Sequence, residues 1–292
     1  MKHEIKNGKL SIAVNETGAE LCNIKSAATG KEFMWSGDPA IWGSTSPVLF
    51  PAIGAIKNGF VKYKGSEYQI PRHGFVRNNT NVELVGQTEE SLTFGLTDDE
   101  ELLKIYPFPF SFQITYTLKG NKIEVSHKIT NRGTDVMLFS LGAHPAFKCP
   151  INEHEDYEDY YLEFEHPESA STWLLASDGL VGTDTKQILD QTNILPLTHS
   201  LFDKDALIFK NLKSRKVALK SKNTTESVIV TYQDFNYLGI WAKPNGDFVC
   251  IEPWLGIADS ANANQQLEDK EGILTLQAGG TFEASYTIEI TE

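Results

Sequence analysis

The sequence predicts an all-β protein, a large antiparallel β-sandwich with few short helices. Apolar and polar residues alternate in segment after segment of the 292-residue chain, which is the period of a half-buried strand. Turn-forming sequences such as "KNG", "NRG", "SDG" and "PNG" separate these segments. Helical patterns are scarce, which disfavours alternating β/α units. No Pro- or Ser-rich linker and no repeat interrupts the pattern, so we expect one domain spanning residues 1–292.

The alternation is clearest in "SFQITYTL" (111–118), where Phe112, Ile114 and Tyr116 fall on one face. The other predicted strands are "LSIAV" (10–14), "LTFGL" (92–96), "KIEVSHKI" (122–129), "DVMLF" (135–139), "YYLEF" (160–164), "KVALK" (216–220), "ESVIVTY" (226–232) and "TFEASYTIEI" (281–290). One short helix is expected in "TDDEELLKIYPFPF" (97–110), where Thr97 and Glu100 fit a capping box. Pro107 should end it after two turns.

Charge and cysteine content exclude several classes of partner. Asp plus Glu number 39 and Lys plus Arg 26, and the net charge of −13 disfavours binding to nucleic acid or to an anionic membrane. No segment has the apolar length of a membrane span or a signal peptide. Three scattered cysteines favour neither a disulfide framework nor a zinc site. We therefore expect a cytoplasmic monomer or homodimer with no metal, no nucleic acid and no membrane partner.

The segment "GAHPAF" (142–147) places His144 directly before Pro145, after an apolar strand. A proline restricts the residue before it to extended backbone, so His144 is not inside a helix. Two interpretations are open from this segment alone. His144 is either a hydrogen-bonded histidine in a turn or a proton donor at the rim of a sheet.

Glu252, in "DFVCIEPWLG" (247–256), is the second unusual residue. Residues 248–251 are apolar, as in a strand buried on both faces, and a carboxylate in such a place is normally paired, neutralised or used in chemistry. Pro253 is expected to end the strand, and Trp254 shares a face with Glu252. The alternative is a strand-end glutamate that has already reached solvent. The segment by itself favours neither.

The segment "PRHGFVRN" (71–78) has His73 at a tight turn between Arg72 and Arg77. Like the segment around His144, it places an imidazole at a turn beside a phenylalanine. The alternative is a polar loop with two surface arginines.

Two further segments contain polar or aromatic residues whose roles the sequence alone does not decide. "LFDKDALIF" (201–209) has Asp203 and Asp205 just before an apolar run, an ordinary position for an aspartate. Trp241 is either a platform for stacking a sugar or a core residue. His127 alternates with core residues, which predicts a structural role.

Taken together, these segments resemble the aldose 1-epimerase (galactose mutarotase) superfamily, most closely its LacX-like branch. The residues that carry the resemblance are "GAEL" (18–21), "SPVLFPAIG" (46–54), "RHGFVRN" (72–78), "YPFPF" (106–110), "GAHPAF" (142–147), "DALIF" (205–209) and "IEPW" (251–254). They occur in the family's order over nearly the whole chain. The resemblance implies the galactose mutarotase-like supersandwich, with a sugar site on its concave face.

The resemblance also implies roles for single residues. His144 is similar to the family's general acid, which protonates the ring oxygen, and Glu252 to the general base at the anomeric hydroxyl. The implied substrate-binding residues are His73, Asp205, Arg72 and Trp241. Asp203 is the alternative to Asp205 for the role of the substrate-binding aspartate. Many relatives have an arginine where this chain has Ala55, and Lys57 or Arg72 is the expected substitute.

The function that this resemblance implies is interconversion of the α- and β-anomers of an aldohexose by acid/base ring opening, without cofactor or metal. A hexose 6-phosphate mutarotase is the first alternative, for which Arg72, Arg77, Lys57 and Lys243 offer the positive charge. The net charge of −13 and Ala55 instead favour a substrate without phosphate. The second alternative is a non-catalytic sugar-binding protein, against which the pair of His144 and Glu252 argues. A glycosidase with two carboxylates is disfavoured because the proton donor is a histidine.

Overall fold

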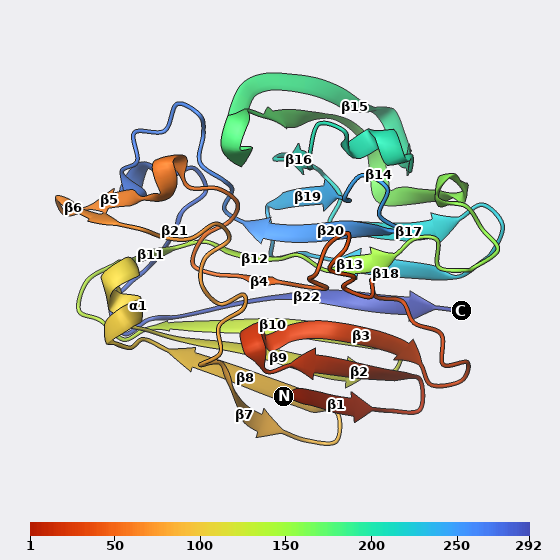
Figure 1. Cartoon of the computed structure of the whole chain (residues 1–292), viewed down its shortest axis with the longest axis horizontal. Coiled ribbons are helices and arrows are strands. Elements are labelled where there is room, and N and C mark those ends of the chain that lie inside the picture. The colour runs from red at the N-terminus through yellow and green to blue at the C-terminus, as the bar shows by residue number, and fades with distance from the viewer.

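The computed structural model describes all 292 residues, apart from the side chain of Ser177, and it is built mainly of antiparallel strands (Figure 1). The largest sheet has nine strands in the order β15-β14-β17-β18-β22-β10-β9-β8-β7. These are β7 (Glu83–Gln87), β8 (Ser91–Thr97), β9 (Phe110–Lys119), β10 (Lys122–Asn131), β14 (Tyr160–Leu175), β15 (Val181–Pro196), β17 (Lys216–Ser221), β18 (Ser227–Thr231) and β22 (Thr281–Thr291). All of their pairings are antiparallel.

A six-stranded sheet has the path β16-β19-β20-β12-β4, with β13 also paired to β20. Its strands are β4 (Val48–Leu49), β12 (Leu141–Ala143), β13 (Ala146–Lys148), β16 (Leu207–Phe209), β19 (Tyr237–Trp241) and β20 (Phe248–Leu255). Three small sheets consist of β1 (Lys2–Lys6), β2 (Leu10–Asn15) and β3 (Glu20–Ser26), of β5 (Val61–Tyr63) and β6 (Ser66–Tyr68), and of β11 (Met137–Phe139) and β21 (Leu274–Leu276).

The core lies between these sheets and follows the predicted alternation. In β9, Phe112, Ile114 and Tyr116 are buried while the residues between them are half-exposed. The same pattern continues through β10 and β22, so one contiguous cluster of buried side chains fills the space between the layers. His127 is buried in this cluster, as predicted, against Phe112, Phe235 and Tyr286. The all-β prediction is confirmed.

Helices are few and short. The single α-helix, α1 (Glu100–Ile105), ends before Pro107 after six residues, close to the predicted two turns. The predicted capping box is wrong, because Thr97 belongs to β8, where it pairs with Ser111. Asp99 caps the helix instead, accepting the Leu102 N–H at 2.8 Å. The remaining helical turns are 3-10 segments at Thr17–Ala19, Lys57–Gly59, Tyr157–Asp159, Ser177–Gly179, His199–Phe202 and Leu267–Asp269.

Strand β20 is buried along its whole length, and it continues through Pro253 to Leu255. The expectation that Pro253 ends the strand is therefore wrong. On one side Pro253 pairs with Leu238 of β19. On the other side β12 pairs only with Trp254 and Leu255, and β13 only with residues 248–250. Pro253 thus lies opposite a gap between β12 and β13, where its missing N–H removes no ladder hydrogen bond.

Both faces of β20 are covered because the long hairpin of β14 and β15 arches over the six-stranded sheet (Figure 1). A second, smaller apolar cluster fills the space beneath this hairpin. It comprises Leu49, Ile53, Val181, Ile208, Trp254, Ile257 and Ala258. The hairpin and its 3-10 turn at Ser177–Gly179 also cover one side of the cavity described below.

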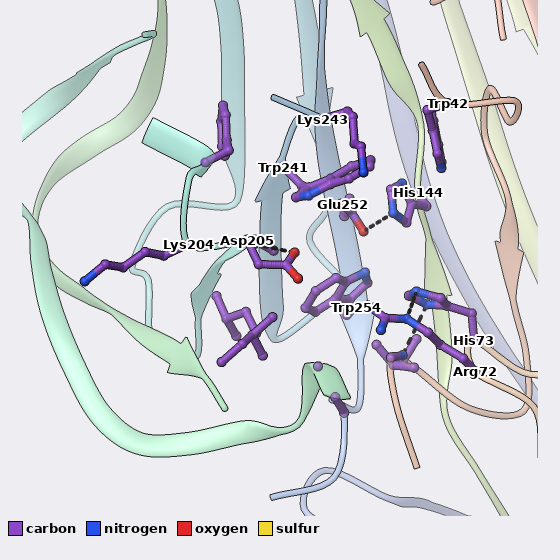
Figure 2. Close-up of a pocket in the computed structure, with 18 of the residues that line it drawn as sticks. Trp42, Arg72, His73, His144, Lys204, Asp205, Trp241, Lys243, Glu252 and Trp254 are labelled. Carbon is purple, nitrogen blue, oxygen red and sulfur yellow. Dashed lines mark hydrogen bonds and ion pairs between the residues drawn. The ribbon is translucent and has the colours of Figure 1, made fainter. Parts of the chain in front are cut away.

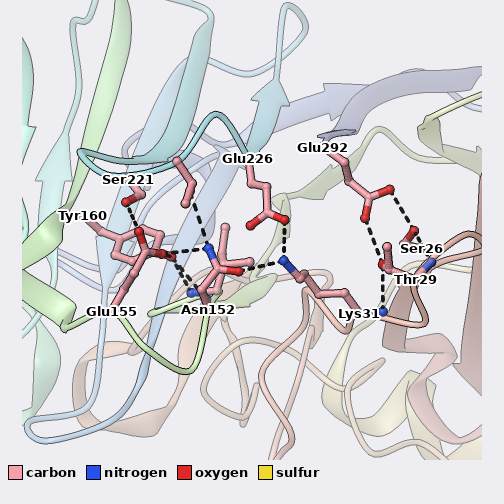
Figure 3. Close-up of polar contacts among 11 residues, drawn as sticks. Ser26, Thr29, Lys31, Asn152, Glu155, Tyr160, Ser221, Glu226 and Glu292 are labelled. Carbon is pink, nitrogen blue, oxygen red and sulfur yellow. Dashed lines mark hydrogen bonds and ion pairs between the residues drawn. The ribbon is translucent and has the colours of Figure 1, made fainter.

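A chain of polar contacts connects segments far apart in the sequence (Figure 3). The Lys31 ammonium donates to Asn152 Oδ1 at 2.7 Å and forms an ion pair with Glu226. The carboxylate of Glu292, beyond the end of β22, accepts the hydroxyls of Ser26 and Thr29 at 2.8 and 3.1 Å. These contacts fix the edge of the N-terminal sheet against the end of the largest sheet. Among the described residues, no helix has the length and apolar character needed to cross a membrane.

Candidate active site

A cavity of about 630 Å³ is lined by residues of the six-stranded sheet and by residues at the turn of the β14–β15 hairpin. A cavity of this size accommodates a monosaccharide. It is lined by all six residues that the sequence singled out for a site, which are Arg72, His73, His144, Asp205, Trp241 and Glu252. These residues come from loops and strands spread over about two thirds of the chain, and Figure 2 shows them converging on one space.

His144 follows β12 and enters the gap between β12 and β13. Its ring stacks on Trp42 at 5.1 Å with an angle of 28°, and meets the edge of Trp241 at 5.7 Å. The Pro145 carbonyl accepts the Ile251 N–H at 3.2 Å, which joins the turn to β20. The imidazole is therefore fixed from three sides, and it is 8% exposed.

Glu252 lies on β20 directly across this gap and is only 1% exposed. The alternative of a glutamate at a strand end in solvent is therefore wrong. Its Oε2 atom is 3.3 Å from Nε2 of His144 (Figure 2). Oε2, His144 Nδ1 and Trp254 Nε1 are all buried and lack a well-aligned hydrogen-bond partner among the described residues. Buried polar atoms without partners are uncommon, and here they gather around one cavity.

Burial shifts both pKa values toward the uncharged forms. It lowers the pKa of His144 to about 3. It raises the pKa of Glu252 well above its usual range; the nearby Asp205 carboxylate raises it further, while the Trp254 indole N–H and Arg72 lower it. Both shifts favour the same arrangement of the pair, a neutral imidazole next to a protonated carboxyl group.

His73 faces His144, with 5.8 Å between the ring centroids. Its backbone is left-handed, at a φ of 65°, and is followed by Gly74 at 75°. A Cβ on Gly74 would lie 2.0 Å from the Phe50 carbonyl oxygen, so only glycine fits. The Gly54 N–H donates to His73 Nδ1 at 3.2 Å, and Arg72 Nε lies 3.4 Å from Nε2. The 46–54 segment thus positions this imidazole.

Asp205 and Asp203 both line the cavity, so the structure brings both candidates to the site. Asp205 is the one whose field raises the pKa of Glu252. Its backbone is left-handed at a φ of 74°, and its Oδ1 accepts the Ala206 N–H at 2.8 Å. Non-glycine residues in this conformation gather at functional sites. Trp241 is half-buried; it lines the cavity wall and also packs against the core.

The structure adds residues that sequence reasoning did not assign to the site. Trp42, Arg77, Lys204, Lys243 and Trp254 also line the cavity. Trp42 comes from a loop with no distinguishing motif. Arg77 and Lys243 had been considered only as possible positive charges, and both lie in the cavity wall. Lys57 does not substitute at Ala55, because its ammonium instead donates to the Ala263 carbonyl at 2.8 Å.

Cys250 stands two residues before Glu252 on the same face of β20. Its sulfur, His144 and Glu252 present ligand atoms within 4.8 Å of one another, a group with the chemistry to hold a soft metal ion. Burial, with a smaller contribution from Glu252, raises the pKa of the Cys250 thiol well above its usual value. A metal would therefore have to displace a tightly held proton from a fully buried thiol.

An all-β sandwich with a histidine–glutamate pair in a sugar-sized cavity has the features of a carbohydrate-active protein. The model of the aldose 1-epimerase family matches residues 1–271, and the chain belongs to this family. It is 36% identical to the plasmid-encoded protein LacX of Lactococcus lactis subsp. lactis over 299 aligned positions, covering 99% of each chain.

Two solved structures share the fold, which is galactose mutarotase-like. A galactose mutarotase related enzyme from Lactobacillus acidophilus is 36% identical, with a TM-score of 0.95 and coverage of 100% of this chain and 98% of that one. A galactose mutarotase-like protein from Lactobacillus casei is 29% identical, with a TM-score of 0.93 and full coverage of both chains.

Proposed function

We propose that this protein is an aldose 1-epimerase that interconverts the α- and β-anomers of an aldohexose, with His144 and Glu252 as the acid/base pair. The observation that carries the proposal is the 3.3 Å separation of His144 Nε2 and Glu252 Oε2 at the buried end of the cavity. Opening a hemiacetal requires removal of a proton at O1 and delivery of another to O5. O1 and O5 are both bonded to C1, so two adjacent groups suit the task.

In the proposed reaction, Glu252 takes the O1 proton and a C1=O1 double bond forms. The C1–O5 bond breaks, its electron pair goes to O5, and the imidazolium of His144 protonates O5. Rotation about C1–C2 presents the other face of the aldehyde. The reverse transfers then close the ring as the other anomer. After the cycle both groups are back in their original protonation states, and the reaction needs no cofactor.

This division of roles needs the shared proton to start on His144. The pair has one proton whether it is arranged as imidazole with carboxylic acid or as imidazolium with carboxylate. Burial favours the first arrangement, while the Trp254 N–H and Arg72 favour the carboxylate by lowering the pKa of Glu252. A sugar hydroxyl at the carboxylate acts in the same direction. Substrate binding therefore shifts the proton toward His144.

Asp205, His73, Arg72 and Trp241 are the proposed substrate-binding residues. Asp205 presents its carboxylate to the cavity beside Trp254 (Figure 2), where it accepts hydrogen bonds from sugar hydroxyls. Trp241 and Trp42 meet edge to face with 5.4 Å between their ring centroids, which gives the apolar C–H face of a pyranose an aromatic surface. The proposed unit of function is the whole chain acting as a single domain.

Polarimetry of freshly dissolved α-glucose and α-galactose, with and without protein, tests the proposal. We expect catalysis well above the spontaneous rate, and anomer exchange in the NMR spectrum at equilibrium. Binding of a sugar without acceleration of exchange would instead support a non-catalytic sugar-binding protein. Lack of both binding and exchange for every aldohexose, neutral or anionic, would reject the proposal.

A further inference from the structure

A buried ion pair lies directly behind the cavity wall. Lys270 Nζ donates to Asp259 Oδ1 at 2.5 Å, and each of the two side chains is only 4% exposed. Ala258, the residue before Asp259, lines the cavity. Taking two charges out of water offsets most of their attraction, so such a pair adds little to stability by itself. Its effect here lies in the segments that it holds together.

Asp259 is hydrogen-bonded to two segments of chain that border the cavity. Its Oδ2 atom accepts the Lys57 N–H at 2.9 Å, and its own N–H donates to the Ala55 carbonyl at 2.9 Å. Its carbonyl accepts the N–H of Val181, the first residue of β15, at 2.8 Å. Asp259 therefore joins the loop that contains Ala55 and Lys57 to the start of β15. Lys270 fixes the carboxylate that makes the first of these contacts.

Gly54, in the same loop as Ala55, holds the imidazole of His73. Its N–H donates to His73 Nδ1 at 3.2 Å, and its carbonyl accepts the His73 N–H at 3.0 Å. Gly54 is itself packed on the residue before Asp259, because a Cβ at Gly54 would lie 2.5 Å from the Cβ of Ala258. A shift of Asp259 would therefore move Gly54 and, with it, the ring of His73 at the cavity.

Val181 holds one end of the turn of the β14–β15 hairpin. It pairs with Ser260 in a parallel bridge, and its carbonyl accepts the Ala261 N–H at 2.9 Å. Gly179, two residues before Val181, lines the cavity, and a Cβ there would lie 2.6 Å from Nη1 of Arg72. The turn thus packs against one of the proposed substrate-binding residues.

The acid/base pair is held by other contacts. Glu252 lies within β20, opposite Gly239 of β19. His144 lies between β12 and β13, which both pair with β20. Strand β20 ends at Leu255, before Asp259. Loss of the ion pair should therefore affect the binding of a substrate more than the transfer of protons.

We propose that Asp259 and Lys270 are positioning residues for the substrate, and that their ion pair holds both His73, through Gly54, and the turn of the β14–β15 hairpin in place at the cavity. The inference rests on the proposed function, in which His73 contacts the sugar. A contact that is equally strong in the ground state and the transition state acts on KM rather than on kcat.

The test compares two double variants, each of which removes both buried charges together and so leaves no unpaired charge. Asp259→Ala/Lys270→Met loses the side-chain contacts, whereas Asp259→Asn/Lys270→Gln keeps them as amide hydrogen bonds. We expect the KM for glucose and galactose, measured by NMR anomer exchange, to rise about 10-fold in the first variant, with kcat within about 3-fold of wild type. In the second variant, KM should stay within about 3-fold of wild type.

Glu226→Gln is the matched control, because it removes the partner of Lys31 in the half-buried ion pair between the N-terminal sheet and the largest sheet. It should alter stability and leave KM unchanged.

A second measurement needs neither sugar nor activity. In wild type, burial lowers the pKa of His73 well below 6.5, and His144, Arg77 and Arg72 lower it further. The Hε1 resonance of His73, assigned with the variant His73→Gln, reports this pKa in a pH titration. In Asp259→Ala/Lys270→Met we expect a pKa closer to 6.5, because a ring released from Gly54 gains contact with water. Asp259→Asn/Lys270→Gln should titrate as wild type does.

A wild-type KM in folded Asp259→Ala/Lys270→Met would overturn the inference, whatever its Tm, and so would a fall in kcat alone. An equal rise of KM in both double variants would also overturn it, since only one of them has lost the contacts. If wild type shows no anomer exchange, the mutarotase proposal fails, and the titration of His73 decides the inference. A shift confined to Asp259→Ala/Lys270→Met would then support it, and identical titrations in all three proteins would overturn it.

Discussion

The Nε2 atom of His144 lies 3.3 Å from Oε2 of Glu252, across the gap that separates β12 from β13. The same gap lies opposite Pro253, the residue that follows Glu252. A proline in each of the two segments, Pro145 and Pro253, thus flanks the place where acid and base meet. The interrupted ladder gives His144 access to the buried carboxyl group, which a continuous strand would deny it.

Glu252→Gln should lower anomer exchange by about 10²-fold or more, because the amide cannot accept the O1 proton. It should also change stability in a pH-dependent way. Burial raises the pKa of Glu252 in the folded protein above its unfolded value of 4.5, so its contribution to stability is full below pH 4.5 and is lost as the pH rises. The variant should therefore gain in Tm relative to wild type more at pH 8 than at pH 4.5.

Glu67→Gln, on the exposed strand β6, is the control for this pair of measurements. It should change neither exchange nor the pH dependence of Tm. Full activity of a folded Glu252→Gln protein would remove Glu252 from the mechanism.

His144→Asn should retain sugar binding and lose most turnover, since the contacts from Asp205 and His73 remain while the O5 proton donor is gone. Pro145→Ala should bind sugar yet turn over more slowly, because relaxing the backbone at His144 lets the imidazole leave its productive position. Fluorescence of Trp42, Trp241 and Trp254 reports binding, and NMR exchange reports turnover separately. Concurrent loss of both in His144→Asn, with an unchanged circular dichroism spectrum, would make His144 a binding residue.

Much of the fold could be predicted from sequence because strands with one face in a shared core must alternate. Phe112, Ile114 and Tyr116 occupy the buried face of β9 as that rule requires. The end of β20 was harder to predict from sequence, because whether a proline ends a strand depends on which strands lie on either side of it. Pro253 lies opposite residues 143–145, which form the gap between β12 and β13 and stand about a hundred positions earlier in the sequence. No local pattern contains this information.

The candidate site could be predicted in part. His144 and Glu252 stood out because an imidazole before proline and a carboxylate in an apolar strand are each unusual. Trp42 did not stand out, because it lies in a loop, and only its stacking on His144 in the folded protein brings it into the site. The net charge of −13 averages over the whole surface and does not describe the charged side chains that line one cavity, so the expectation of a substrate without phosphate stays a prediction.

Gly239→Ala should lower kcat/KM by displacing Trp254. A Cβ at Gly239 of β19 would lie 2.5 Å from the Trp254 ring, and one at Gly142 of β12 would lie 2.8 Å from it. The two glycines therefore leave room for the indole against the sheet, where Trp254 lines the cavity and its N–H is buried. A displaced indole no longer favours the carboxylate of Glu252. Gly8→Ala, where a Cβ meets nothing within 4 Å, is the control, and equal kcat/KM in both variants would contradict this role for Trp254.

His127→Phe should remove part of the acid sensitivity of folding. Burial lowers the pKa of His127 to about 4, from 6.5 in the unfolded chain, and neither ring nitrogen has a partner among the described residues. Its folded form thus resists protonation, so stability is full above pH 6.5 and falls as the pH drops toward 4. The pKa difference corresponds to a loss of about 3 kcal/mol. Urea unfolding at pH 7, 5.5 and 4 should show wild type losing more stability than His127→Phe by about this amount, since His73 and His144 contribute equally to both proteins. Parallel losses in the two proteins would contradict the lowered pKa of His127 in the folded protein.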